Sequence, residues 1–232
     1  KEQKYAFYHE WFARIFRYKA HTLSAAEENL LAKMHFLSEA PDAIYYFLTN
    51  ADLHFPPLQS MDGEELTQQN FTMHEKNPDV AVRKEAFTSL YSTFHDFGNT
   101  ISTSYTNNVK ALTTEAEMRH YDSALAMTLY EDDVPQSVYD SLLDSVHRHL
   151  PLLHRYYAKK KELLGLPEQH MYDVYLSLIK GTAKTYTFAE AKELCIASVA
   201  PLGEEYQTIY RKAFDERWMD VYPREGKAGG AY

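Results

Sequence analysis

The chain has 232 residues, 45% of them hydrophobic, and a formal net charge of −9 at pH 7, which suits a globular protein with a substantial core. The acidic balance argues against a broad nucleic-acid surface, because affinity for phosphates needs clustered Lys and Arg. The one basic run, Lys159 to Lys161, is predicted to be a solvated helix face. No apolar run approaches the ~18 residues that a membrane-spanning helix needs.

Residues 1–76 are predicted to form an N-terminal helical region. From residue 1 to about residue 20, apolar side chains recur at three- and four-residue spacing, which is typical of an amphipathic helix. Ser24 and Glu27 form a capping box that starts the next helix. Pro41 is predicted to open a third, shorter helix, because proline is favoured at the first helical position.

A β-hairpin is predicted near residues 53–67. Asp62-Gly63 is a favoured hairpin turn, and the flanking runs on both sides read as its arms. Pro56 and Pro57 would confine the first arm to a sheet edge.

Residues 77–232 are predicted to form a long-helix region that is incomplete at its C-terminal end. A helix is predicted to begin near Asn77 and to continue to about residue 112, although the β-branched stretch 102–108 permits a break. Further helices follow from Thr114 and Ser123, and a long one begins at Pro135 and stops at Gly165.

The last helices follow an irregular stretch, residues 170–180. Thr187 and Glu190 form a second capping box, whose helix is predicted to run to about residue 202. Cys195 lies on this helix among apolar residues and is predicted to be a buried structural thiol. Gly203 then separates a final helix, residues 204–219.

No complete catalytic set is found in the sequence. A His-Glu-x-x-His helix, which would place two histidines on one face, is absent. The chain has a single Glu-x-x-His pair, Glu117 and His120, where a di-metal bundle needs two such pairs and two more acids. His147 and His149 point to nearly opposite sides of a helix, so they cannot share a metal from one face.

The final residues carry three of the eight glycines, Gly226, Gly229 and Gly230. Glycine permits unusual dihedral angles and close approach of another backbone. Two interpretations remain open, a frayed tail or the start of a functional segment. Because the chain starts without Met and its opening already has the pattern of a helix interior, both ends are expected to be cuts in a longer protein.

Several strings in one order resemble the oligoendopeptidase F family, which is a group of thimet-oligopeptidase-like zinc metallopeptidases. They are Tyr121–Leu125 (YDSAL), His149–Tyr156 (HLPLLHRY), His170–Tyr175 (HMYDVY), Ala200–Tyr206 (APLGEEY) and Arg217–Pro223 (RWMDVYP). The fold is thus expected to be mostly α-helical with the one small β-hairpin predicted above, and the resemblance implies that it is part of a zincin-like helical oligopeptidase with a deep channel. It implies that the chain is an internal fragment ending before the His-Glu-x-x-His zinc helix.

The resemblance also implies what the longer protein does. It would be a cytoplasmic zinc metalloendopeptidase acting on short unstructured peptides, with no nucleic acid or membrane as partner. The fragment alone would be inactive, would bind no zinc, and would supply helical scaffold and channel lining. Its uncovered apolar surface predicts self-association. The alternatives are a non-enzymatic helical module that binds peptides or a partner helix and, more remotely, a helical protein with its own metal site.

Candidate residues for the substrate channel follow from the same resemblance. They are Tyr172, Tyr175, Gly229, Gly230, Ala231 and Tyr232. The bare backbone of the final residues is expected to continue as a strand that pairs with an extended peptide. For the two earlier tyrosines, ordinary packing with a hydroxyl partner remains the alternative. Ala228 stands where the family usually has Arg, which puts any charge contact from that position in doubt.

Overall fold

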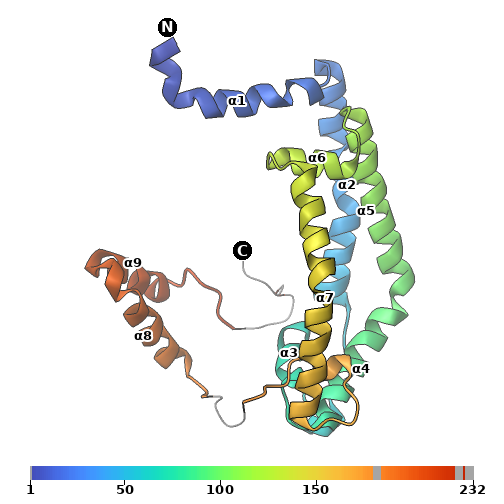
Figure 1. Cartoon of the computed structure of the whole chain (residues 1–232), viewed down its shortest axis with the longest axis vertical. Helices are drawn as coiled ribbons and strands as arrows, with labels where there is room; N and C mark the ends of the chain where they lie inside the picture. The colour runs from blue at the N-terminus through green and yellow to red at the C-terminus, as the bar shows by residue number, and fades with distance from the viewer. Residues whose placement is uncertain (1, 180–183, 223–226, 228–232) are drawn as a thin grey trace.

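The computed structural model describes residues 2–179, 184–222 and 227, and the described part of the chain is almost entirely helical. Within these described ranges, nine α-helices follow one another with short 3₁₀ turns between several of them (Figure 1). They are α1 (His9–Arg17), α2 (Ala25–Phe47), α3 (Gln68–Glu75), α4 (Val80–Asp96), α5 (Gly98–Met118), α6 (Ala124–Glu131), α7 (Gln136–Leu164), α8 (Phe188–Ser198) and α9 (Glu204–Asp215). The mostly α-helical prediction is confirmed.

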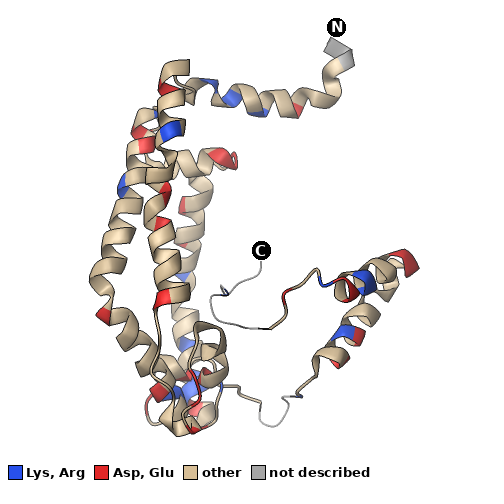
Figure 2. Cartoon of the chain, turned by 180° about the vertical axis from the view of Figure 1, so that it is seen from behind, with Lys and Arg blue, Asp and Glu red and all other residues tan. Residues whose placement is uncertain are grey.

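The N-terminal helix α1 projects away from the other helices in both views (Figures 1 and 2). Its last residue, Arg17, fixes this arm to the end of α6. The guanidinium lies 4.8 Å from the ring centre of Tyr130, forms an ion pair with Asp133, and donates a hydrogen bond of 3.2 Å to the carbonyl of Glu131. The Tyr130 hydroxyl donates in return to the Arg17 carbonyl at 2.7 Å. Cation–π and hydrogen-bond contacts therefore hold the base of the arm.

The helix α2 begins at the predicted capping box, in which the Ser24 side chain accepts from the N–H of Glu27. It then continues through Pro41, so the prediction of a separate helix from Pro41 is wrong. A proline inside a helix removes one backbone hydrogen bond and usually interrupts it. Here α5 packs alongside α2, and the buried Ser104 donates a hydrogen bond to the Pro41 carbonyl. These contacts keep α2 continuous.

The predicted β-hairpin is wrong. The described part of residues 53–67 contains one isolated antiparallel bridge, in which the Leu58 N–H donates to the Glu64 carbonyl at 2.9 Å. The turn chemistry is as expected, since Asp62 and Gly63 have φ angles of 55° and 82°. However, the strand arms do not form, and a 3₁₀ turn occupies Gln59–Met61.

A side chain on α4 accepts hydrogen bonds from backbone N–H groups that the arms of a hairpin would need for pairing with each other. The Glu85 carboxylate accepts the N–H groups of Ser60 and Gln59, each at 2.9 Å. Hydrogen bonds from Ser60 and Gln59 also hold the pKa of Glu85 below its usual value. Leu58 and Leu66 are buried against α4, so the segment forms a packed loop. Its core cluster comprises Leu58, Leu66, Ala86 and Leu90, with Phe55, Met61, Phe71 and Phe94 packed around it.

The predicted long helix from Asn77 is divided at a different place from the one expected. Asp79 caps α4, and the helix ends before Phe97, whose φ and ψ are −97° and 12°. The second helix, α5, then runs unbroken through residues 102–108. Packing of Ser104 against α2 maintains helix where β-branched residues would otherwise favour a break.

The longest helix, α7, has 29 residues, most of them exposed. It ends as predicted at Gly165, whose φ is 66°. The N–H of Gly165 bonds to the carbonyl of Glu162 at 3.0 Å, and the N–H of Leu166 to that of Lys161 at 3.1 Å. These two bonds satisfy carbonyls at the helix end, which is the function of a left-handed cap.

The helices α8 and α9 contact each other and lie apart from the other helices in both views. The predicted capping box at Thr187 is confirmed. The helix that it starts ends at Ser198, four residues earlier than expected, and a 3₁₀ turn containing Pro201 follows. Cys195 is exposed, so the prediction of a buried thiol is wrong. The neighbouring Ile196 is buried in its place.

Candidate functional site

The segment 166–176, here called the anchored loop, is held to α4 by a buried ion pair. Both Nε and Nη2 of Arg83 donate to Oδ1 of Asp173, at 3.1 and 2.7 Å, and both side chains are 2% exposed. The other carboxylate oxygen accepts the N–H of His170 at 2.9 Å. Arg83 also donates from Nη1 to the carbonyls of Asn77 and Pro78, each at 2.9 Å. Each buried charge is therefore paired, which offsets the cost of removing it from water.

A second buried cation ties the anchored loop to α7. Lys160 is 6% exposed, and its Nζ donates to the carbonyl of Val174 at 2.6 Å. The prediction of a solvated face is therefore wrong for Lys160, although Lys159 is exposed. The reason is helical periodicity, because Lys160 follows Tyr157 by three residues and precedes Leu164 by four. That spacing places it on the apolar stripe of α7.

The two candidate tyrosines of the anchored loop have different environments. Tyr172 is 9% exposed, stacks on the His170 ring at a centroid distance of 4.8 Å, and meets Phe87 edge-on at 5.9 Å. Tyr175 is 52% exposed. The structure thus brings Tyr172 into packing contacts and leaves Tyr175 open to a ligand. A channel-lining role for either residue stays a prediction.

The other candidate residues, Gly229, Gly230, Ala231 and Tyr232, lie outside the described residues, and so does Gly226. Lys227 is described, and its carbonyl accepts a hydrogen bond from the Gln69 side chain on α3. Its Nζ donates to the carbonyls of Asp220 and Tyr222, at 2.6 and 3.0 Å. These contacts place the Lys227 backbone beside α3.

The described residues do not fit a zinc centre. Among them, no group of three His, Cys, Asp or Glu side chains is placed so that it could hold a metal ion. His147, His149 and His154 lie along the exposed length of α7, where the His149 ring bonds to the Ser145 carbonyl at 2.6 Å. No catalytic step through zinc is therefore assigned to these side chains. No helix in the described ranges is long and apolar enough to cross a membrane.

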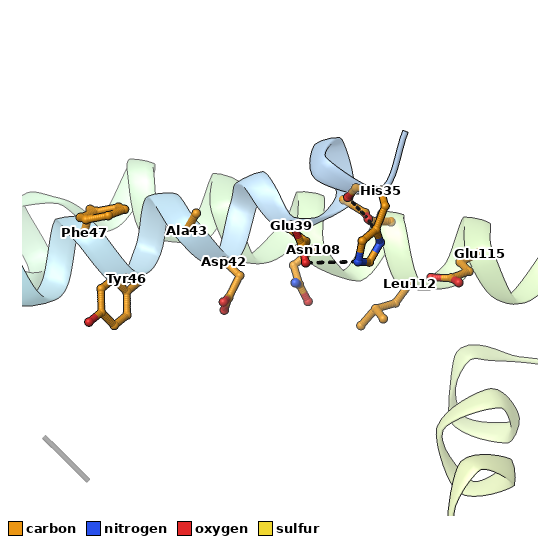
Figure 3. A pocket seen from close by; sticks show the side chains of 11 residues that line it. His35, Glu39, Asp42, Ala43, Tyr46, Phe47, Asn108, Leu112 and Glu115 are labelled. Atoms are coloured by element: carbon orange, nitrogen blue, oxygen red, sulfur yellow. Dashed lines mark hydrogen bonds and ion pairs between the residues drawn. The ribbon is translucent and has the colours of Figure 1, made fainter. Parts of the chain in front are cut away.

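A groove with a volume of about 510 Å³ lies between α2 and α5. Figure 3 shows that side chains at helical spacing on α2 face a second row from α5. The row on α2 includes His35, Glu39, Asp42 and Tyr46, and the row on α5 includes Asn108, Leu112 and Glu115. This α2–α5 groove contains three carboxylates and both aromatic and aliphatic surface.

The carboxylates of the α2–α5 groove differ in how they are paired. Glu39 lies 3.2 Å from Nε2 of His35, and Glu115 accepts from Nε of Arg119 at 2.9 Å. For Asp42, the described part of the chain offers no cationic group within ion-pair distance. Lys and Arg are spread over several helices (Figure 2). The groove is therefore an acidic surface with an unneutralised carboxylate at its centre.

Comparison with known proteins identifies the family. The family profile described as Peptidase family M3 matches residues 73–232, which is more than half of the chain. The chain belongs to peptidase family M3. A second profile, described as Oligopeptidase F, matches residues 1–55.

Relatives of this M3 family chain match nearly all of it. Oligopeptidase PepF of Bacillus subtilis is 36% identical over 234 residues, which is 100% of this chain and 35% of the relative. Group B oligopeptidase PepB of Streptococcus agalactiae is 39% identical over 227 residues, which is 97% of this chain and 38% of the relative. The crystal structure of oligoendopeptidase-F from Enterococcus faecium has a TM-score of 0.73 and 33% identity, covering 94% of this chain and 40% of that one. The M3 family chain thus spans a little over a third of the length of these curated relatives.

Sequence reasoning missed Arg83 and the buried role of Lys160. For Lys160 a signal was present, because it occupies an apolar-stripe position of α7. For Arg83 the neighbouring Val82 and Ala86, both buried, mark the inner face of α4. The partner, Asp173, is 90 residues further along the chain, so no local pattern connects the two.

Proposed function

We propose that this M3 family chain is part of a longer zinc-dependent oligoendopeptidase that hydrolyses short peptides in the cytoplasm. The observation that carries the proposal is the Peptidase family M3 match over residues 73–232. Supporting it, the chain spans 35% to 40% of two relatives and of a solved neighbour that are named as oligopeptidases or oligoendopeptidases.

In this proposal the longer protein folds as a largely helical body around a deep channel, and the present chain supplies scaffold and part of the channel wall. The anchored loop suits this role, since Arg83 binds its Asp173 side chain and Lys160 binds its Val174 carbonyl, while Tyr175 stays exposed. An anchored backbone reduces the conformational entropy that a loop loses when it binds a peptide. The final residues, with their small side chains, are proposed to pair with the extended peptide backbone.

Zinc, held by residues of the longer protein outside this chain, would supply Lewis-acid activation of a water molecule. The described residues contribute no ligand set, so their part is to position the peptide and to shape the channel. A narrow channel would admit unstructured peptides and exclude folded proteins.

The experiment compares the 232-residue chain with the longer gene product in an assay of internally quenched peptides. We expect the longer protein to cleave short peptides, to lose activity with a zinc chelator, and to regain it on addition of zinc. The 232-residue chain is expected to be inactive under the same conditions. Absence of chelator-sensitive cleavage by the longer protein, or cleavage by the short chain, would overturn the proposal.

A further inference from the structure

The α2–α5 groove has the chemistry of a site for a cationic side chain. Positions 35, 39, 42 and 46 recur every three or four residues, so one face of α2 directs an imidazole, two carboxylates and a phenol along the groove. Figure 3 shows Asp42 and Tyr46 pointing to the same side of α2. The opposite wall is formed by α5, with Glu115 at one end.

The charge state of the groove decides what it binds. Glu115 accepts a hydrogen bond from Arg119, and Glu39 lies 3.2 Å from Nε2 of His35. Asp42 has no cation among the described residues within ion-pair distance, and the chain as a whole carries a net charge of −9. Because one imidazole carries at most one positive charge, it cannot neutralise both Asp42 and Glu39, so the groove keeps a negative potential that attracts cations and repels acidic ligands.

The aromatic surface beside the carboxylates favours binding of a cationic amino-acid side chain over a free metal ion. Tyr46 is 44% exposed and lies on the same side of α2 as Asp42, and Phe47, which also lines the groove, is 61% exposed on the other side of the helix (Figure 3). An Arg or Lys side chain would place its aliphatic stem on the Tyr46 ring and its charge on the carboxylates, combining cation–π contact with a charge-assisted hydrogen bond. Although His35 and Glu115 also line the groove, no three His, Cys, Asp or Glu side chains among the described residues are placed so that they could hold a metal ion.

We propose that the α2–α5 groove binds peptides through an Arg or Lys side chain, with Asp42 and Glu39 as the anionic partners and Tyr46 as the stacking surface. The class of ligand, a peptide, rests on the proposed function. The preference for a basic residue rests on the groove itself. The site thereby gives the oligopeptidase a preference for basic over acidic peptides.

The test measures binding to the 232-residue chain by fluorescence anisotropy at low salt. Three labelled peptides are used, identical except for a central Arg, Gln or Glu. We expect the Arg peptide to bind most tightly and the Glu peptide most weakly, with the difference shrinking as salt is added. In Asp42→Asn the affinity for the Arg peptide should fall about fivefold, the upper range for an exposed ion pair, and the affinity for the Gln peptide should stay constant.

The matched control is Asp140→Asn, which removes an exposed carboxylate from α7, away from the groove. It should leave all three affinities unchanged, and circular dichroism should show the same helicity for both variants. Equal binding of the Arg and Glu peptides, no binding of any peptide, or an unaffected Asp42→Asn variant would overturn the proposal.

The same substitution in the longer protein separates this inference from the proposed function. There we expect Asp42→Asn to raise KM for Arg peptides about fivefold with little change in kcat. The reason is that the lost ion pair is exposed and would bind the substrate and the transition state equally well. An unchanged KM in an active enzyme would show that another segment covers the groove and would overturn the inference alone. An inactive longer protein, with binding intact in the short chain, would count against the peptidase proposal alone.

Discussion

The ion pair between Arg83 and Asp173 shows how single residues determine the position of the anchored loop. Two side chains, each 2% exposed, join α4 to a 3₁₀ turn that lies far along the sequence. Burying two charges is costly, and their mutual attraction compensates only when hydrogen bonds satisfy the remaining donors and acceptors. Here the carbonyls of Asn77 and Pro78 and the N–H of His170 do so.

Removing one partner of this pair should therefore be strongly destabilising. We expect Asp173→Asn to lower the free energy of unfolding by about 3 kcal/mol, because the Arg83 charge is left buried without its counter-ion. Urea unfolding followed by circular dichroism measures the change. The matched control is Glu162→Gln, which breaks the exposed pair of Glu162 with Lys159 and should cost less than about 0.5 kcal/mol. Equal effects of the two substitutions would contradict a buried, fully paired contact.

Glu75 leads to a prediction of the opposite sign, because its substitution is expected to raise the free energy of unfolding, and to do so only at high pH. Its side chain is 4% exposed, and burial raises its pKa above the usual glutamate value. The folded state thus binds this proton more tightly than the unfolded chain, so the group lowers stability as the pH rises from the unfolded pKa through the folded one. We expect Glu75→Gln to be more stable than the original chain above that window and equally stable below it. Urea unfolding across a pH series measures this.

The control for that series is Glu85→Gln, which should give the reverse sign. Hydrogen bonds from Ser60 and Gln59 lower the pKa of Glu85, so its contribution is present above the unfolded pKa and is lost as the pH falls through the folded one. Glu85→Gln should therefore lose stability at neutral pH, and the loss should vanish in acid. If the stabilities of the two variants changed with pH in the same direction, burial would not be what sets the pKa of Glu75.

At the scale of elements, the helix ends were predictable because their signals are local. Ser24 and Thr187 each satisfy an N–H three residues ahead, and Gly165 adopts the left-handed conformation that a C-terminal cap requires. Each of these motifs closes within five residues. Neighbouring helices do not alter them, so sequence alone identified the three positions.

The elements that were predicted wrongly are those in which a distant helix supplies the decisive contact. Pro41 does not end α2, because α5 packs along it and Ser104 bonds to its carbonyl. The hairpin does not form, because Glu85 on α4 binds the N–H groups of Ser60 and Gln59. In both cases tertiary contacts outweigh a correct local preference, and no pattern within the segment reveals them.

At the scale of the whole molecule, the family was identifiable from the sequence, but the binding surfaces were not. Ordered strings such as His170–Tyr175 identify the family without any three-dimensional information. The α2–α5 groove arises only when Asp42 and Glu115, 73 positions apart, are brought to one surface. The division at residues 76 and 77 stays a prediction.

The described helices also leave a large amount of apolar surface open. Along α7, Val138, Leu142, Val146 and Leu153 fall on one face, and Leu142 is 61% exposed. Exposed hydrophobic surface is spread likewise over α1 and α2. Soluble monomers rarely expose contiguous apolar patches of this kind, and such patches generally mark interfaces. The curated relatives are nearly three times as long, which leaves ample chain to cover them in a longer protein.

The isolated 232-residue chain should therefore self-associate through the apolar stripe of α7. Sedimentation velocity is expected to show a dimer or larger species whose fraction rises with concentration. Leu142→Lys should shift the distribution toward monomer, because a charge buried at the contact is costly. Asp144→Lys introduces the same side chain on the opposite face of α7 and should leave the distribution unchanged. A monomer at every concentration would show that this stripe is tolerated in water, and equal effects of the two lysines would place the contact on another helix. Disruption by Leu142→Lys but not by Asp144→Lys would identify the face of α7 that must be covered in the longer protein.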